Sequence, residues 1–251
     1  MSRIPGFALL AMAAICGVGA LSSPDRGQPR QCRPVDFEGD RFTVCRAVRG
    51  QQTLTLFGRD GLGQAYRQFA ALPLDGRNVA FAMNAGMFDS TGKPIGLFVS
   101  DGRTQSPLNR KRASTGNFFL QPNGVFYGDS FGWHVSTSDA YAADPSRHPG
   151  FATQSGPMLV IANTVNPLFG SDGLSRYVRN GVGVDAKGDA WFAISAAPVS
   201  FGRFGRLFRD RLHTPDALYF DGYVSSLWDP ATNRRDDRAE LGPIVVALQK
   251  R

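Results

Sequence analysis

Short apolar runs of strand length, separated by turn residues, dominate the hydrophobic pattern of the chain. Residues 41–48 and 52–58, RFTVCRAV and QTLTLFG, alternate apolar and polar side chains as a half-buried strand does. The continuous apolar run VAFAM, residues 79–83, is typical of a strand buried on both faces. Turn residues at Asp101–Gly102 and at 185–189 predict hairpins between neighbouring strands.

Two segments have the period of an amphipathic helix. Residues 61–72 place apolar side chains on roughly one face, and residues 201–212 do the same before Thr214–Pro215 ends the pattern. Many strands and few helices, without regular β–α alternation, predict an α+β fold. We expect a single domain over residues 32–251, with a mixed or antiparallel β-sheet core and a few packed helices.

The first residues of the chain have a different character. Residues 4–21 are almost wholly apolar and small, they follow one positive charge, and Val18–Gly19–Ala20 suits cleavage. We interpret residues 1–20 as a secretory signal peptide and the polar residues 21–31 as a linker. An uncleaved membrane anchor is the alternative, because the run is near the lower length limit for spanning a bilayer. We therefore expect an exported protein, periplasmic or extracellular after cleavage.

Cleavage would leave Cys32 and Cys45 as the cysteines of the mature chain. An even number of cysteines in an exported protein predicts a disulfide, so we expect Cys32 and Cys45 to be bonded. Two unrelated buried thiols are the alternative.

The charge balance of the 251-residue chain is basic, with a net charge of +7. Such a charge favours anionic partners, but an exported protein rarely meets nucleic acid. We expect phosphorylated envelope carbohydrate rather than nucleic acid as the partner, and a plain role in solubility is the alternative. Any membrane attachment would come from an uncleaved signal segment.

Familiar metal and nucleotide motifs are missing from the sequence, so we assign no metal ligands and no cofactor. One motif does match on paper: Ser130 lies in Gly128–Gly132, which has the G-x-S-x-G spacing of serine hydrolases. That motif requires a strand before it and a helix after it, whereas the pattern around Ser130 suits two strands and a tight turn.

Carboxylates for acid–base chemistry would be aspartates, because glutamate occurs only at positions 38 and 240. Asp221 directly follows the apolar run ALYF, residues 217–220, so its carboxylate is expected at the rim of the core. Neighbours rather than bulk water would then set its pKa. Asp221 is the first catalytic candidate, and Asp185 is the second, although Asp185 also suits a turn.

Polar side chains stand beside glycine at three further strand ends. They are Asn84–Ala85–Gly86, Gln154–Ser155–Gly156 and Arg179–Asn180–Gly181. Glycine lets a backbone approach a ligand closely, and the planar fork of an arginine suits phosphate. Asn84, Gly86, Gln154, Ser155 and Arg179 are therefore candidate substrate-binding residues. Plain turns are the alternative for each segment, but together they favour a shared cleft.

These segments resemble the phosphodiester glycosidase (NAGPA) domain family, the family of the uncovering enzyme, and in particular its bacterial exported branch. The resembling stretches, in order, are MNAGMF (83–88), PIGLFVSDG (94–102), GNFFLQPNGVFY (116–127), QSGPMLV (154–160), SRYVRNGVGV (175–184), FAISAAPVSF (192–201) and ALYFDGYVSSLW (217–228). The resemblance implies cleavage of the bond between a sugar C1 oxygen and phosphate.

The resemblance also implies roles for single positions. The matching positions are Asn84, Gly86, Arg179, Gly183, Asp221, Ser225 and Ser226. By this resemblance Arg179 would bind the phosphodiester, Asp221 would act as base or nucleophile, and Ser225 or Ser226 would hold sugar or phosphate oxygens. The chain departs from the wider family where Tyr223 and Val224 replace two glycines of an Asp-Gly-Gly-Gly-Ser-Ser motif.

The sequence thus favours an exported hydrolase, a glycosidase that cleaves a sugar-1-phosphodiester in envelope or extracellular glycans. A non-catalytic module that binds anionic phosphoglycans of the envelope is one alternative, since it would not need Asp221. A serine hydrolase that uses Ser130 is the other.

Overall fold

The computed structural model describes residues 1, 30–74, 78–112 and 114–250. Apart from Met1, the expected signal peptide lies outside the described residues, as does most of the expected linker. Within the part of the chain that is described, no helix is both long and apolar enough to cross a membrane.

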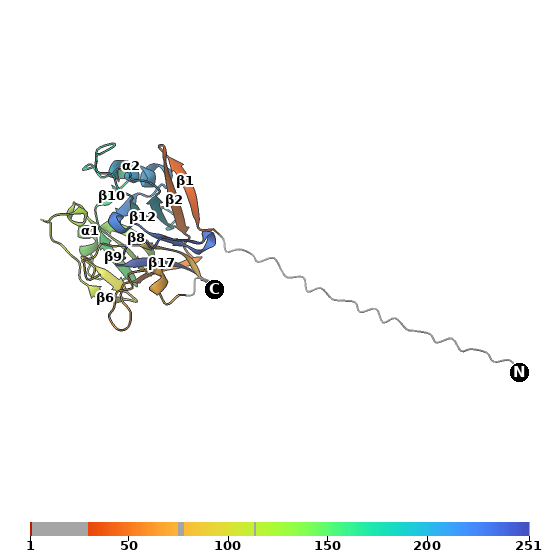
Figure 1. Cartoon of the computed structure of the whole chain (residues 1–251). Coiled ribbons are helices and arrows are strands. Elements are labelled where there is room, and N and C mark those ends of the chain that lie inside the picture. Colours follow the sequence, from red (N-terminus) through yellow and green to blue (C-terminus); the bar gives the residue numbers. More distant parts are fainter. Residues whose placement is uncertain (2–29, 75–77, 113, 251) are drawn as a thin grey trace.

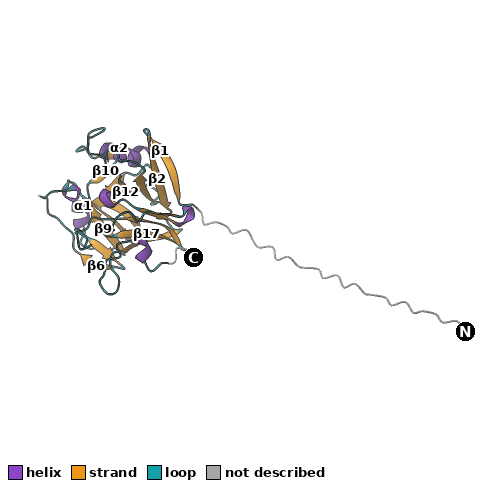
Figure 2. Cartoon of the chain, viewed as in Figure 1, coloured by secondary structure: helices purple, strands orange, loops and turns teal. Residues whose placement is uncertain are grey.

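Three β-sheets form the framework of the described chain (Figures 1 and 2). The first sheet has the order β1 (Cys32–Phe37), β2 (Asp40–Ala47), β13 (Ala190–Ser195), β12 (Asn180–Val184), β14 (Asp216–Tyr219), β10 (Met158–Ile161) and β11 (Thr164–Val165). The second has the order β16 (Arg234–Arg235), β15 (Leu227–Asp229), β4 (Val79–Asn84), β17 (Ile244–Gln249) and β3 (Gln52–Phe57). The third has the order β6 (Arg103–Ser106), β5 (Phe98–Ser100), β9 (Phe151–Ser155), β7 (Gly124–Asp129) and β8 (Gly132–Thr137).

Helices are short and connect successive strands along the chain (Figure 2). They are α1 (Ser138–Ala142), α2 (Phe201–Arg206) with the π-helical turn η3 (Leu207–Arg211), and the 3₁₀ turns η1 (Phe69–Ala71), η2 (Asn117–Phe119), η4 (Gly222–Val224) and η5 (Pro230–Thr232). Every pairing between these strands is antiparallel. The architecture is mainly β and compatible with the expected α+β class.

One apolar cluster joins the three sheets. Phe81 of β4, Phe126 of β7 and Phe192 of β13 are fully buried and meet edge to face, with ring centroids 5.2 to 5.7 Å apart. Phe220 adds a fourth ring, 6.4 Å from Phe126. Because Phe220 is anchored in this shared core, the position of Asp221 beside it is set by packing from all three sheets.

The amphipathic segment 201–212 forms a helix as predicted. Its apolar stripe, which includes Phe204 and Phe208, packs against β10 and β14 of the first sheet. The helix predicted over 61–72 is wrong, because only Phe69–Ala71 forms a 3₁₀ turn. Arg67 has a positive φ of 57°, and Asp60 accepts the backbone N–H of Gln64, so this segment is a folded loop.

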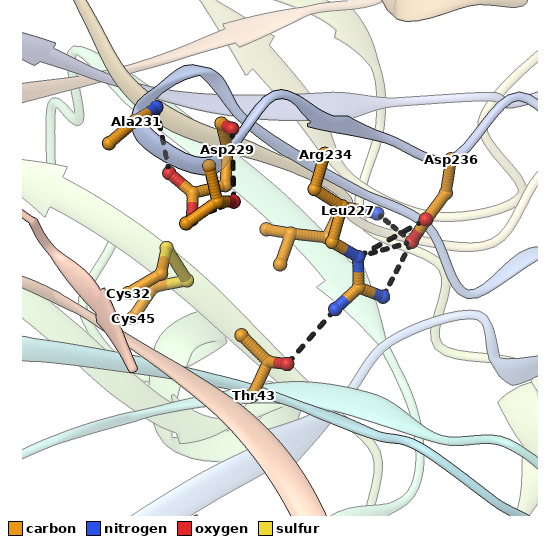
Figure 3. The surroundings of a disulfide bond; sticks show 9 residues. Cys32, Thr43, Cys45, Leu227, Asp229, Ala231, Arg234 and Asp236 are labelled. Atoms are coloured by element: carbon orange, nitrogen blue, oxygen red, sulfur yellow. Dashed lines mark hydrogen bonds and ion pairs between the residues drawn. A yellow bond between two sulfur atoms is a disulfide. The ribbon is translucent and has the colours of Figure 1, made fainter. Parts of the chain in front are cut away.

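The expected disulfide is present between β1 and β2 (Figure 3). Cys32 and Cys45 are direct cross-strand neighbours with a Cα–Cα distance of 3.9 Å. Near it, Arg234 bridges two sheets, since its Nη1 donates to Thr43 Oγ1 at 2.9 Å. Asp236 binds the same guanidinium and accepts the backbone N–H of Leu227 at 3.0 Å. These contacts fix the segment that follows Ser226.

Candidate active site

Strand ends from the first and second sheets meet at one place. β4 ends at Asn84, β12 begins at Asn180, and β14 leads directly into Asp221. The backbone N–H of Phe220 donates to the carbonyl oxygen of Asn180 at 3.0 Å, and that of Asp221 donates to Ala85 at 3.2 Å. Segments more than 90 residues apart in sequence are thus hydrogen-bonded at this junction.

The side chain of Asn84 forms the centre of the junction. Its Nδ2 donates to the carbonyl oxygen of Asp221 at 2.8 Å. Its Oδ1 accepts hydrogen bonds of 2.8 Å from Asn180 Nδ2 and from the backbone N–H of Ser226. Because Asn84 is only 1% exposed and these atoms are engaged, it acts as a clamp on the Asp221 loop.

The two serines beyond Asp221 differ in their access to solvent. Ser226 is buried, and its hydroxyl donates to the carbonyl oxygen of Val224 at 2.8 Å. Ser225 is partly exposed, and its Oγ lies 3.2 Å from Asn180 Oδ1 and 3.3 Å from the carbonyl oxygen of Val178. The lone pairs of Ser225 Oγ are therefore the ones that a ligand hydroxyl could use.

The carboxyl group of Asp221 has a raised pKa. Asp221 is the N-cap of η4, where its Oδ1 accepts the backbone N–H of Tyr223 at 3.2 Å. Burial raises the pKa of the partly exposed Asp221 carboxyl from 3.8 to about 6, and the Tyr223 N–H opposes that rise. The carboxyl group therefore changes its protonation state near neutral pH, as a group in acid–base chemistry should.

Arg179 lies fully buried under the junction. Its Nε donates to the carbonyl oxygen of Val199 and its Nη2 to that of Ser175, each at 2.8 Å. The guanidinium carbon stacks 3.5 Å from the ring centroid of Phe201, and burial lowers its pKa. Within the described residues Nη1 has no hydrogen-bond partner, and Arg179 has no carboxylate in an ion pair. A buried cation without a counter-ion is costly, so this position favours an anion nearby.

Tyr219 connects the buried arginine to the Asp221 loop. Its ring centroid lies 5.4 Å from the Arg179 guanidinium carbon, and the side chain is 1% exposed. Burial raises the pKa of the Tyr219 hydroxyl, while the Arg179 charge lowers it and the Asp221 charge raises it. The hydroxyl sits directly against Gly222, where a methyl group would overlap it. The phenol of Tyr219 thus lies between the arginine and the carboxylate and interacts electrostatically with each of them.

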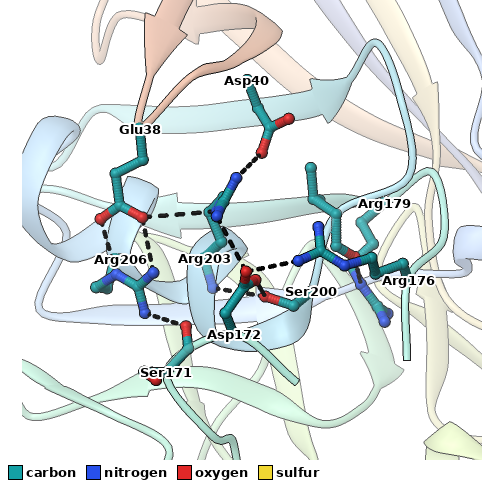
Figure 4. Close-up of polar contacts among 10 residues, drawn as sticks. Glu38, Asp40, Ser171, Asp172, Arg176, Arg179, Ser200, Arg203 and Arg206 are labelled. Atoms are coloured by element: carbon teal, nitrogen blue, oxygen red, sulfur yellow. Dashed lines mark hydrogen bonds and ion pairs between the residues drawn. The ribbon is translucent and has the colours of Figure 1, made fainter. Parts of the chain in front are cut away.

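Ion pairs hold the segment that leads into Arg179 (Figure 4). Asp172 accepts hydrogen bonds from Ser200 Oγ at 3.0 Å, Arg176 Nη2 at 2.6 Å and Arg203 Nη2 at 3.1 Å. Ser200 and Arg203 belong to the start of α2, so the segment is fastened to that helix. The carbonyl oxygen of Ser175 that receives Arg179 is thereby held in place.

The sequence model of the phosphodiester glycosidase (NAGPA) family matches residues 77–244, which include every side chain of this junction.

The chain belongs to the phosphodiester glycosidase family.

Individual relatives agree with this assignment. The chain is 33% identical to the Escherichia coli (strain K12) protein described as uncharacterized protein YigE, over 182 residues and 70% of each protein. Its fold is similar to the catalytic domain of zebrafish N-acetylglucosamine-1-phosphodiester α-N-acetylglucosaminidase, auto-inhibited by its pro-peptide. That similarity has a TM-score of 0.60 and 14% identity, and covers 88% of this chain and 82% of the other.

A hypothetical protein from Synechocystis also shares the fold, with a TM-score of 0.53 and 15% identity. The similarity covers 87% of this chain and 61% of that one. At these identities the solved structures show the fold alone.

The glycine of the phosphodiester glycosidase strand–turn motif has a packing reason. A methyl group at Gly86 would lie 2.5 Å from the carbonyl oxygen of Gln154 and would overlap the Thr153 hydroxyl. Glycine therefore lets the turn after β4 lie against β9. This close approach brings Ser155 and Gln154 to the neighbourhood of the junction, but it does not bring the Gln154 side chain to Asp221.

Gln154 and Ser155 are both buried. Gln154 Oε1 accepts the backbone N–H groups of Leu97 and Asn109, at 3.0 and 2.9 Å, and its Nε2 donates to Asn109 and Ser138. Its polar atoms are thus fully used within the protein. Ser155 is fully buried, and its Oγ has no hydrogen-bond partner among the described residues. Among the described residues, the Ser155 hydroxyl can therefore form a further hydrogen bond, whereas the Gln154 amide cannot.

The structure does not place Asp185 with Asp221. Asp185 follows the far end of β12, about 17 Å from Asn180 at the usual rise per residue. Its Oδ1 accepts the backbone N–H groups of Lys187 and Asp189, and its Oδ2 accepts the Trp191 Nε1–H at 2.9 Å. These bonds make Asp185 the turn former of the β12–β13 hairpin, so it forms no carboxylate pair with Asp221.

Ser130 lies on the tight turn between β7 and β8, and a strand follows it as expected. That geometry lacks the strand-to-helix turn of a nucleophile elbow. Among the described residues no group of three His, Cys, Asp or Glu side chains is arranged to hold a metal ion.

Sequence reasoning missed the role of Tyr219, which lies within an apolar strand pattern. The sequence did contain one indication of this role, because a tyrosine in a buried strand usually needs a polar partner for its hydroxyl.

Proposed function

We propose that this protein hydrolyses the bond between the anomeric carbon of a sugar and a phosphodiester oxygen. The observation that carries the proposal is the presence of two groups at one junction: a partly buried Asp221 carboxyl with a pKa of about 6, and the buried Arg179, which has no carboxylate partner among the described residues. The first suits chemistry at an anomeric carbon, and the second suits a negatively charged leaving group. Membership of the phosphodiester glycosidase family supports the same reaction.

In this reaction the C1–O bond breaks, and the phosphate leaves as a monoester. If Asp221 acts as a base, it takes a proton from a water molecule whose oxygen bonds to C1. If Asp221 acts as a nucleophile, its oxygen bonds to C1, and water later hydrolyses that ester. Phosphate leaves readily, so a second carboxylate as general acid is less necessary than in other glycosidases. The distance of Asp185 from the junction is compatible with this chemistry.

We propose that Arg179 acts on the substrate through its charge, without touching it. Its side chain has no exposed surface, so its positive charge stabilises the departing phosphate from beneath the loop. The partly exposed Ser225 is placed to hold a sugar or phosphate oxygen. Asn84 keeps Asp221 and Ser226 in position, and Gly86 allows the two sheets to meet.

We further propose that the reaction takes place outside the cytoplasm, on phosphorylated envelope or extracellular carbohydrate. The apolar start of the sequence, the net charge of +7 and the Cys32–Cys45 disulfide support this location and substrate class.

The test compares Asp221→Asn with Asp185→Asn in purified protein lacking residues 1–20. A panel of methyl sugar-1-phosphate diesters serves as substrate, and released sugar is the readout. We expect Asp221→Asn to lose turnover by at least about a hundredfold, and Asp185→Asn to retain it. Equal turnover by Asp221→Asn and wild type, with the fold intact, would exclude the assignment. Binding without turnover by wild type would instead favour a non-catalytic phosphoglycan-binding module.

A further inference from the structure

A cavity lies beside the loop that follows β4. Its volume is about 730 Å³, within the usual range for small-molecule sites. One wall comes from residues 89–95 and the other from residues 106–111. Asp221 is not among the residues that line this cavity.

Hydrogen bonds between the two walls give the cavity a fixed shape. Asn109 Nδ2 donates to the carbonyl oxygen of Ile95 at 3.0 Å, and Ser106 Oγ donates to that of Pro94 at 3.3 Å. Behind them, the buried Gln154 binds the Asn109 backbone through both its oxygen and its nitrogen. The side chain of Gln154 thus builds this cavity.

The cavity combines an apolar floor with a cationic rim. Pro94, Ile95 and Leu108 contribute apolar surface, and the exposed Lys93, Arg110 and Lys111 contribute the charges. Within the described residues, Lys93 and Lys111 form no ion pair, and Arg110 reaches an aspartate, Asp139, only at 3.9 Å.

One acidic residue at the rim, Asp89, offsets one of the three positive charges. Asp89 Oδ1 accepts hydrogen bonds from the backbone N–H and hydroxyl of Thr91, at 2.9 and 2.7 Å, and from the backbone N–H of Lys93. These bonds, together with the charge of Lys93, lower the pKa of Asp89, so its carboxylate stays ionised within its own turn. The rim therefore retains an excess of two positive charges, which is complementary to an anion.

The backbone links this cavity to the proposed active site. The N–H of Ile95 donates to the carbonyl oxygen of Met87 at 3.0 Å. Two residues earlier, the carbonyl oxygen of Ala85 accepts the N–H of Asp221 at 3.2 Å. Two residues span at most about 7 Å, so the cavity and Asp221 share the turn after β4.

We propose that this cavity binds a second phosphodiester group of the substrate, carried on a polyol or apolar backbone, beyond the bond cleaved at Asp221. The inference rests on the proposed function for the identity of that substrate. The cationic rim holds the phosphate, and the apolar floor accepts the carbon chain that joins one phosphate to the next. The preferred substrate is accordingly a polymeric or amphiphilic phosphodiester.

The test uses binding of a short, fluorescently labelled poly(glycerol phosphate), which contains no sugar C1–O–phosphate bond. Binding is followed by anisotropy with the full mature chain. One variant combines Lys93→Gln, Arg110→Gln and Lys111→Gln. The matched control combines Arg49→Gln, Lys187→Gln and Lys250→Gln, which remove the same charge from two other cavities that share no lining residue with the first. Neutral polyglycerol and inorganic phosphate serve as competitor ligands.

We expect the first triple variant to weaken binding by at least about tenfold, and the control variant to change it by less than about twofold. Neutral polyglycerol should not compete, and inorganic phosphate should compete only weakly because it lacks the chain. Equal losses in the two variants, or no binding by wild type, would overturn the inference.

Turnover measurements separate this inference from the proposed function. If wild type hydrolyses no sugar-1-phosphodiester but the first triple variant alone loses the probe, the cavity stands and the proposed function fails. If wild type is active and both triple variants bind the probe equally well, the proposed function stands and the cavity inference fails. Where both hold, the first triple variant raises KM for a polymeric substrate and leaves kcat unchanged.

Discussion

The side-chain amide of Asn84 donates a hydrogen bond of 2.8 Å to the backbone carbonyl oxygen of Asp221, across 137 residues of sequence. This bond ties the end of β4 in the second sheet to the end of β14 in the first. The backbone of Asp221 is therefore held by a buried amide from another sheet, while its carboxylate is held by the Tyr223 N–H of its own loop. A substitution at Asn84 should therefore change both the position of Asp221 and the stability of the sheet junction.

Substitution Asn84→Ala should therefore affect both properties. It removes the acceptor of the buried Ser226 N–H and one acceptor of Asn180 Nδ2. We expect the free energy of unfolding to fall by about 1–3 kcal/mol, and turnover to fall more than tenfold. Urea denaturation and sugar release measure the two effects. The exposed Gln105→Ala is the control, and wild-type turnover in Asn84→Ala would contradict the positioning role.

Substitution Gly222→Ala tests the contact between the Asp221 loop and Tyr219. The added methyl group would overlap the Tyr219 hydroxyl and lie 3.0 Å from the carbonyl oxygen of Val178. The Tyr219 ring cannot move aside, because Phe201 packs against it edge to face at 4.9 Å. We expect a loss of about 1–3 kcal/mol in stability and a larger relative loss in turnover.

Gly61→Ala is the matched control, because a methyl group there meets nothing within 4 Å. If Gly222→Ala resembles this control in both turnover and denaturation midpoint, the rigid contact with Tyr219 does not exist in solution.

The hairpins and strands could be predicted from the sequence because their information is local. Positive φ at Asp101 and Gly102, 51° and 70°, matches the turn that the dipeptide predicts. The helix expected over 61–72 does not form, and the reason is also local. Gly63 and Arg67 adopt positive φ values of 80° and 57°, so turn geometry prevailed over apolar periodicity.

The candidate site was predictable only in part, because strand direction is not visible in an isolated sequence pattern. Asn84 and Asp221 both follow apolar strands, and the structure joins them. Asp185 has the same appearance, but β12 runs antiparallel to β14 and carries Asp185 to the opposite end. The complete burial of Arg179 and its contact with Tyr219 depend on tertiary packing, which no local pattern encodes.

The disulfide should stabilise the fold without influencing the reaction. A sequence separation of 13 between Cys32 and Cys45 corresponds to about 3 kcal/mol in the chain-entropy description. Three strands, β2, β13 and β12, separate β1 from β14, which places Cys32 about 19 Å from the strand that carries Asp221.

The double variant Cys32→Ala with Cys45→Ala should therefore unfold at lower urea concentration and keep wild-type kcat. Comparison with wild type under oxidising and reducing conditions supplies the control, since reduction should affect only wild type. A kcat change in the double variant at temperatures where it remains folded would show that β1 and β2 influence the site.

The raised pKa of Asp221 predicts an opposite dependence of stability and activity on pH. The folded protein holds the Asp221 proton up to about pH 6, whereas the unfolded chain releases it near the ordinary value of 3.8. Between these values the folded state binds more protons, so stability falls as the pH rises through this window. The full shift corresponds to at most about 3 kcal/mol, relative to an Asp221→Asn variant that does not titrate.

Activity should change in the other direction, because a base or a nucleophile requires the ionised carboxylate. We expect kcat/KM to rise about tenfold per pH unit below about pH 6 and to level off above it. Urea denaturation of wild type and Asp221→Asn from pH 4 to about pH 8 measures the stability term, and Asp185→Asn should follow wild type in both experiments. A rate that instead falls as the pH rises through 6 would make Asp221 a general acid. The protonated carboxyl would then donate to the leaving oxygen, and another group would have to activate the water.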